Sequence, residues 1–133
     1  MSIPVHFIVG VSREIYKRVF NSLLGESVCE ASLFFLYRRL GRDPFEVLWD
    51  DPKTFYRELE RIFKVGAKVL IKLLVSRINS EFGLNMDPEH FLELMQRGDQ
   101  ISVEKIRLFL KRVAELYEGK DETYNKASIL QPS

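Results

Sequence analysis

The chain has 133 residues, of which 46% are hydrophobic and 29% are charged. This balance excludes intrinsic disorder and is enough for one domain with a complete core. The formal net charge of +1 gives no long-range attraction for nucleic acid or anionic lipid, so such binding would need a local patch, and no apolar run is long enough to cross a membrane.

The compartment is predicted from the cysteine content and the N-terminal sequence. Cys29 is the only cysteine, so no internal disulfide can form and we expect a cytoplasmic protein. The first residues lack a basic segment and a small-residue cleavage site, so no secretory signal is predicted. The abundance of Lys, Arg and Glu with few Gln is typical of thermophile proteins.

The N-terminal segment is apolar and rich in β-branched residues over residues 3–9, with Pro4 near its start. It fits a short strand, an arm, or an extension of the helix that follows. A single strand is not stable alone and would need a partner chain or a groove. We therefore expect a homodimer or another protein partner, with an interface that uses four alternate residues: Ile3, Val5, Phe7 and Val9.

Two helices are predicted next in the chain. Apolar residues at helical spacing follow Ser12 as far as Gly25, which is expected to end the first helix. Ser27 and Glu30 have the spacing of a capping box and begin a second helix that is apolar almost all round. That pattern predicts that the second helix is the central one. Its apolar surface, together with that of residues 3–9, also suggests homodimerisation.

Three Asp-Pro pairs each predict a helix start, because Asp caps a helix and Pro is favoured in its first turn. The pair at residues 51–52 begins a long helix that is expected to end at Gly83. Glycine is a poor helix former, so Gly66 in the middle of this helix indicates a close helix approach or a break. The three pairs are Asp43–Pro44, Asp51–Pro52 and Asp87–Pro88.

The last helix is predicted to begin with Ser102 as its cap and to end at Gly119. Residues 120–133 lack periodicity, and we expect a flexible tail. These features predict an all-α chain with a single-domain bundle of five to six helices over residues 1–119 and, at its N-terminus, a short strand or arm as an option.

Few side chains carry the chemistry of an active site. His6 lies in an apolar run, and Cys29 is expected to be a buried structural thiol, so no nucleophile, base and orienting group can be assembled. His90 and Glu93 share one helix face, which is too few ligands for a structural zinc site. We therefore predict no catalytic, cofactor-binding or metal-binding residue.

A basic pattern is formed by Lys64, Lys68 and Lys72, whose spacing of four residues places them on one helix face. Such a pattern usually indicates a helix face that is exposed to solvent. Nucleic-acid binding through this face is an alternative function, and it would weaken steeply with salt. Binding of a small apolar ligand in the bundle core is a second alternative.

The segment from residue 24 to residue 78 has a familiar order of signals: Leu24–Gly25, an apolar helix, Leu40–Gly41, an Asp-Pro start, and Phe63-x-x-Gly66-Ala67-Lys68 before a long apolar helix. This layout resembles the Nitrosopumilus output domain, an archaeal family of small helical domains. In that family a glycine often follows the phenylalanine, whereas Lys64 stands here, which favours an unbroken helix. The resemblance implies a non-enzymatic regulatory or protein-interaction module of signalling proteins, with undefined molecular activity.

Overall fold

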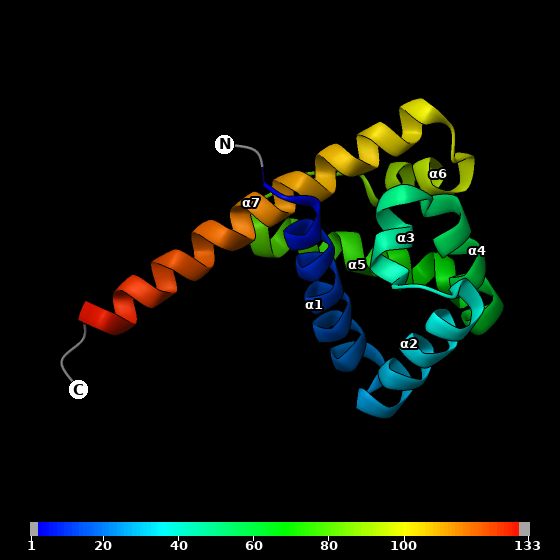
Figure 1. The fold of residues 1–133 in the computed structure, drawn as a ribbon, viewed down its shortest axis with the longest axis horizontal. Coiled ribbons are helices and arrows are strands. Elements are labelled where there is room, and N and C mark those ends of the chain that lie inside the picture. Colours follow the sequence, from blue (N-terminus) through cyan, green and yellow to red (C-terminus); the bar gives the residue numbers. More distant parts are fainter. Residues whose placement is uncertain (1–2, 131–133) are drawn as a thin grey trace.

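The computed structural model describes the backbone of residues 3–130 and the side chains of residues 3–119. Over this range the chain is a compact all-α domain without strands (Figure 1), which confirms the predicted fold class. The helices, one more than the upper count expected, are α1 (Val5–Leu24), α2 (Glu26–Leu40), α3 (Pro44–Asp50), α4 (Pro52–Phe63), α5 (Gly66–Phe82), α6 (Pro88–Arg97) and α7 (Gln100–Leu130).

Of the three forms expected for residues 3–9, extension of the following helix is confirmed and the strand or arm is wrong, because α1 begins at Val5, directly after Pro4. Pro4 has extended dihedrals, and its carbonyl accepts from the backbone N–H groups of Phe7 and Ile8 at 3.1 and 3.3 Å. A proline has no N–H to lose at a helix start, so it suits this place. Ile8 and Val9 are buried in the core, which extends the apolar stripe of α1 to its first turn.

The connection between α1 and α2 is the single residue Gly25, with φ 89°. It ends α1 and precedes α2, which therefore begins at Glu26 and has no side-chain cap. The predicted capping box of Ser27 and Glu30 is not formed, because Ser27 already lies inside the helix. A positive φ is open to glycine without a steric penalty, and this permits the abrupt turn.

The prediction that the second helix is central is also wrong. Figure 1 shows α2 at the edge of the molecule, away from α6 and α7, and it packs on α1, α3 and α4. It buries only Cys29, Ser32 and Leu36. The central part of the core is filled instead by large side chains of the other helices, among them Tyr16, Phe20, Phe45, Phe55, Leu59, Met95 and Ile106.

The three Asp-Pro starts are confirmed at α3, α4 and α6. In each helix the Asp side chain accepts a backbone N–H of the first turn and Pro is the first helical residue. The N···O distances are 2.9 Å at Asp43, 3.3 Å at Asp51 and 3.0 Å at Asp87. These caps satisfy backbone donors that have no partner within the helix.

The long helix expected between Pro52 and Gly83 is broken into α4 and α5. The break is at Lys64, which has φ 55° and ψ −133°, and the following Val65 has φ −61° and ψ −22°. These dihedrals are close to those of a type II′ turn, in which glycine dominates the first central position. The expectation of an unbroken helix at Lys64 is therefore wrong, and the alternative of a break near Gly66 is confirmed.

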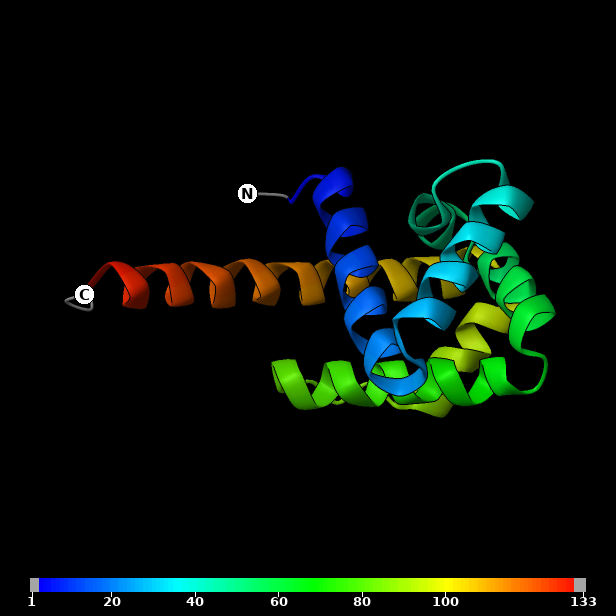
Figure 2. The same ribbon diagram turned by 90° about the horizontal axis from the view of Figure 1, so that it is seen from below.

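The last helix begins earlier and ends later than predicted. The carboxylate of Asp99, and not Ser102, accepts a backbone N–H, that of Ser102, at 2.7 Å. α7 passes through Gly119 without ending and extends beyond the other helices to Leu130 (Figure 2). A glycine inside a helix costs about 1 kcal/mol relative to Ala but does not forbid helical dihedrals. The last predicted tail residues, 131–133, lie outside the described residues.

Candidate interaction surface

The outward side of α2 carries three exposed aromatic side chains. Phe34, Phe35 and Tyr37 are 57%, 52% and 48% exposed. Large aromatic side chains are normally among the most buried groups of a domain on average. We call this surface the α2 face, and it consists of Glu30, Ala31, Phe34, Phe35, Tyr37 and Arg38, all of which are exposed.

The helix that carries this face is held firmly against the domain. The hydroxyls of Tyr16 and Ser32 share a buried hydrogen bond of 2.7 Å, and the Ser32 hydroxyl also donates to the Cys29 carbonyl at 2.7 Å. The Arg39 guanidinium donates to the Glu58 carboxylate of α4 at 3.0 Å. Leu36 is fully buried. The exposure of the aromatic residues is therefore a property of a fixed helix.

The side chains of the α2 face are also arranged relative to one another. The rings of Phe34 and Phe35 have centroids 5.9 Å apart at an interplanar angle of 73°, a favourable edge-to-face geometry. The Arg38 guanidinium lies 5.8 Å from the Phe34 ring centroid, within the range of a cation–π contact. These contacts already restrict the Phe34, Phe35 and Arg38 side chains in the free domain, so a partner that binds them loses less conformational entropy.

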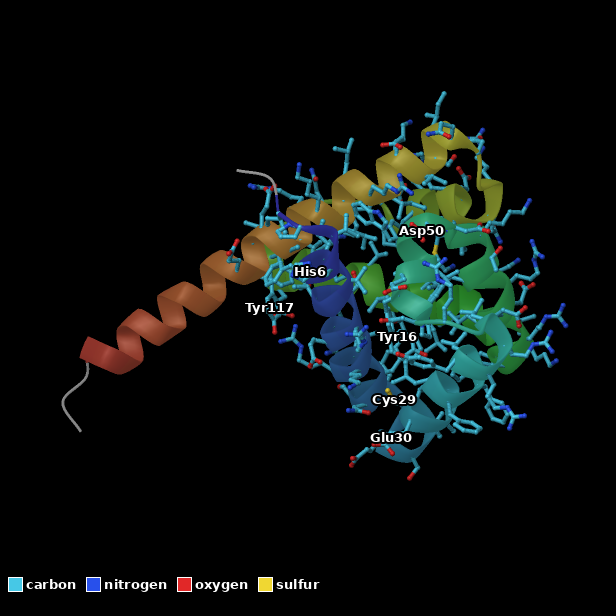
Figure 3. The ribbon with its side chains drawn as sticks, in the orientation of Figure 1. His6, Tyr16, Cys29, Glu30, Asp50 and Tyr117 are labelled. Atoms are coloured by element: carbon cyan, nitrogen blue, oxygen red, sulfur yellow. The ribbon has the colours of Figure 1, made fainter. Side chains whose placement is uncertain are left out.

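The α2 face has one acid and one base without an ion-pair partner among the described residues. Arg39 is paired with Glu58, and Arg42, after the helix, is paired with carboxylates of α3. No such partner is found for Glu30 or Arg38. Figure 3 shows Glu30 at the outer side of α2, pointing away from the domain, whereas Cys29 faces inward.

The residues predicted as the dimer interface do not form one surface. Helical geometry replaces the alternation of a strand: Val5 and Val9, four residues apart, share one face of α1, whereas Phe7 lies on another and Ile3 precedes the helix. Val9 is buried, Ile3 and Phe7 are partly buried against the core, and Val5 is exposed. Ile3, Phe7 and Val9 thus contribute to the packing of the core, and only Val5 of the four is free for a partner.

The predicted basic face is divided by the helix break. Lys64 lies in the turn between α4 and α5, while Lys68 and Lys72 lie on α5. The Lys72 ammonium is 3.0 Å from the Glu89 carboxylate of α6, whereas Lys64 and Lys68 are exposed and have no ion-pair partner among the side chains of residues 3–119. The structure therefore leaves two of the three lysines available to an anion.

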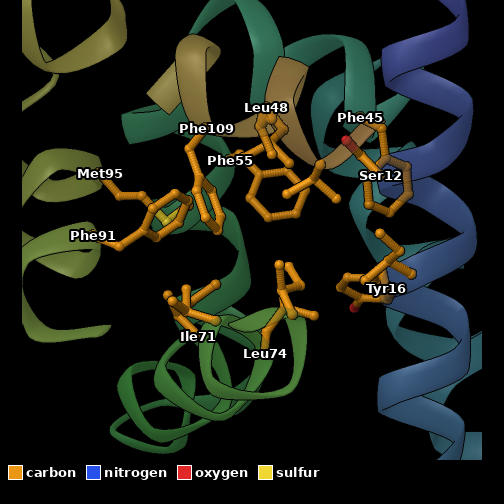
Figure 4. Close-up of a pocket in the computed structure, with 15 residues that line it drawn as sticks. Ser12, Tyr16, Phe45, Leu48, Phe55, Ile71, Leu74, Phe91, Met95 and Phe109 are labelled. Carbon is orange, nitrogen blue, oxygen red and sulfur yellow. The ribbon is translucent and has the colours of Figure 1, made fainter. Parts of the chain in front are cut away.

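The bundle core contains a small apolar cavity between α1, α3, α4, α5, α6 and α7 (Figure 4). Its volume is about 40 Å³, and its wall includes Phe45, Phe55, Phe91, Met95 and Phe109. Drug-sized ligands occupy sites of about 300–1,000 Å³, and an apolar cavity that binds benzene has a volume of about 150 Å³. The cavity as it stands is too small for an apolar ligand of that size.

The ionisable groups named from the sequence are mostly surface or structural groups. Among the described side chains, no three His, Cys, Asp or Glu residues are grouped closely enough to hold a metal ion. His90 Nδ1 is 3.9 Å from the Glu93 carboxylate on the surface of α6. Cys29 is buried, and this burial raises the pKa of its thiol, which disfavours the reactive thiolate.

The sequence suggested that the apolar second helix takes part in a dimer, but it did not single out the exposed aromatic residues, although one signal for them exists. On a helical wheel, Cys29, Ser32 and Leu36 lie on one side of α2, and Phe34 lies on the opposite side. Ser32 in the buried set hides this pattern, because a serine is ordinarily read as a surface residue.

Comparisons with known proteins give no relative from which a function could be transferred. Over residues 3–119, no helix is long and apolar enough to cross a membrane. The resemblance of residues 24–78 to the Nitrosopumilus output domain stays a prediction. No protein-family model, curated protein or solved structure matches the chain.

Proposed function

We propose that this chain is a non-enzymatic protein-interaction module that binds polypeptides through the α2 face. In the same proposal it is a cytoplasmic, regulatory domain of archaeal type, as the cysteine content and the resemblance over residues 24–78 imply. Composition also favours a thermophilic source.

The observation that supports this proposal is the exposure of Phe34, Phe35 and Tyr37 on a fixed helix. Aromatic residues are enriched in protein interfaces and supply most binding hot spots. Each ring exposes about 100 Å², half of a typical aromatic side chain. Covering that area is worth about 2.5 kcal/mol per ring, which a partner gains with little ordering of the helix.

The proposal can be tested with a photo-crosslinking amino acid at position 34, in lysate of the cells that make this protein. The matched control is the same amino acid at position 108, because Leu108 is 67% exposed on α7 and lies outside the α2 face. We expect covalent adducts to a polypeptide from position 34 and not from position 108. Equal yields of adducts at the two positions, or none at position 34, would contradict the proposal.

A further inference from the structure

We propose that the α2 face binds the α2 face of a second copy of this chain, with the two helices antiparallel about a two-fold axis at Phe34. This inference rests on the proposed function of the α2 face and names its partner. A two-fold interface is isologous, so one surface must be complementary to itself. The charges, the shape and the size of the α2 face each bear on that requirement.

The charges of the α2 face are complementary under this symmetry. Glu30 lies four residues before Phe34 and Arg38 four residues after it, which is about 6 Å along the helix on either side. An antiparallel partner centred at Phe34 therefore brings the Glu30 carboxylate of each copy opposite the Arg38 guanidinium of the other. These are the two charges of the face that lack an ion-pair partner within the described domain.

A parallel arrangement is disfavoured by the same two residues. It would place Glu30 against Glu30 and Arg38 against Arg38, and like charges facing each other across an interface are unfavourable. The helix dipoles add to this preference, since antiparallel helices bring opposite ends together. The sign of the charges thus selects one direction.

The spacing of residues on this side of α2 suits helix-to-helix packing. Ala31, Phe34 and Arg38 of the α2 face, preceded by the exposed Ser27 one turn earlier, follow at intervals of 4, 3 and 4 residues, which is the repeat of a two-helix seam. Ser27 and Ala31 are small, so the backbones can approach and leave room for the aromatic rings of the partner. Arg38 already lies over the Phe34 ring, so the central pair needs little rearrangement.

The size of the surface sets the expected strength. Three half-exposed aromatic side chains offer about 300 Å² per copy, to which Val28, Ala31 and the aliphatic parts of Glu30 and Arg38 add. The aromatic part is thus about 600 Å² for two copies, and the total stays below the lower limit of about 1,200 Å² for standard interfaces, in the range of weak, transient complexes. We therefore expect a dissociation constant on the order of micromolar.

The test is sedimentation equilibrium of the full chain over a wide concentration range with charge-reversal variants. Glu30→Arg and Arg38→Glu each convert two symmetric attractive contacts into repulsive ones, so each is expected to raise the dissociation constant at least about tenfold. The double variant Glu30→Arg/Arg38→Glu restores both contacts with exchanged signs. Its dissociation constant is expected to return to within about threefold of the wild-type value, since the pair is coupled.

Matched controls are Glu14→Arg and Lys105→Glu, which reverse single exposed charges outside the α2 face and are expected to leave the dissociation constant unchanged. Circular dichroism checks that every variant stays folded, as exposed positions allow. A wild-type chain that stays monomeric at the highest concentration, or a double variant no tighter than the single ones, overturns the antiparallel dimer.

The outcomes of this test and of crosslinking at position 34 separate the two proposals. A monomeric chain that still forms adducts with a different polypeptide at position 34 contradicts the dimer and supports the interaction module. A monomeric chain that forms no adducts contradicts both proposals. A dimer that the double variant restores, with adducts between two copies, supports both.

Discussion

The hydroxyl oxygen of Tyr16 in α1 lies 2.7 Å from that of Ser32 in α2, and both residues are buried. Ser32 also donates to the Cys29 carbonyl at 2.7 Å, so its single proton is used there and the Tyr16 hydroxyl is the donor between the two. This bond is one of the contacts that hold α2 with its Ser32 side toward the core, together with the burial of Cys29 and Leu36.

Replacing Ser32 with Ala is expected to destabilise the domain by about 1–3 kcal/mol, because the Tyr16 hydroxyl is then buried without a partner. Tyr16→Phe is expected to cost about 1 kcal/mol, since Ser32 keeps its bond to the Cys29 carbonyl. Urea unfolding of the two single variants and the double variant measures these costs. We expect the double variant to lose less than the sum; additive losses would show that the two hydroxyls do not interact.

The same tyrosine predicts how stability changes at alkaline pH. Burial raises the pKa of Tyr16 well above its ordinary value, with the hydrogen bond to Ser32 acting in the opposite direction. Tyr16 therefore keeps its proton more strongly in the folded state. Its contribution to stability is complete below the unfolded pKa of about 10 and is lost as pH rises above it.

Tyr16→Phe is accordingly expected to flatten the fall of stability above about pH 10, as measured by urea unfolding at several pH values. Tyr56→Phe is the comparison variant. Burial, with the neighbouring Glu60, also raises the pKa of Tyr56, which lies on α4, so Tyr56→Phe is expected to flatten part of the same fall and shows the share that is not due to Tyr16. If the stability of Tyr16→Phe falls above about pH 10 as steeply as that of the wild type, the raised pKa of Tyr16 is not the cause of this fall.

The two neighbouring caps Asp43 and Asp51 are expected to differ in strength. Both accept a backbone N–H, but Asp43 also forms an ion pair with Arg13 of α1 and is the more buried of the two. Asp51→Ala is expected to cost about 1 kcal/mol, as for an ordinary cap. Asp43→Ala is expected to cost about 2 kcal/mol or more, because it also leaves Arg13 without its partner.

Thermal or urea unfolding of both variants gives the comparison, and Arg13→Ala separates the two parts of the Asp43 effect. If the Asp43 cap acts alone, the costs of Asp43→Ala and Asp51→Ala would be equal. That result would show that the link between α1 and α3 contributes nothing measurable.

These caps belong to the part of the fold that local sequence determines. Each Asp-Pro pair fixes a helix start through the side chain of Asp and the fixed φ of Pro, and both act within the same turn. The burial of Ser32 could not be predicted in this way. It depends on Tyr16, sixteen residues earlier, so tertiary contacts contribute to which side of α2 faces the core.

The candidate site also combines features that the local sequence predicts with features that depend on tertiary contacts. The apolar character of α2 was evident from the sequence, but a helix that is apolar all round gives no indication of which residues face the solvent. The residues at 3–9 fit a strand and a helix equally well over so short a run. Core packing of Ile8 and Val9 favours the helix, and this packing depends on residues far along the chain.

The lysines are expected to make only a weak nucleic-acid site. Lys72 is held by Glu89, so Lys64 and Lys68 remain, and two phosphate contacts give a slope of about −2 in a plot of log affinity against log salt. We expect fluorescence anisotropy with a duplex to show this shallow slope, and Lys64→Glu/Lys68→Glu to abolish what binding exists. A slope steeper than about −5, characteristic of six or more phosphate contacts, would contradict this and favour a nucleic-acid function.

Replacing Lys64 with Gly is expected to stabilise the domain. Lys64 has φ 55° with ψ −133°, a conformation in which a side chain costs about 1–3 kcal/mol and glycine costs little. Against this, glycine raises the entropy of the unfolded chain by about 0.4–1 kcal/mol. The net gain is expected to be about 1 kcal/mol, measured as a higher urea midpoint at an unchanged slope.

Lys64→Ala is the control for this substitution, because it removes the same charge and keeps the Cβ atom. It is expected to have a stability within about 0.5 kcal/mol of the wild type, as for an ordinary surface change. A Lys64→Gly variant no more stable than Lys64→Ala would show that the turn between α4 and α5 carries no strain at this residue. A gain in Lys64→Gly alone would show that the side chain at position 64 opposes the break that separates the two helices.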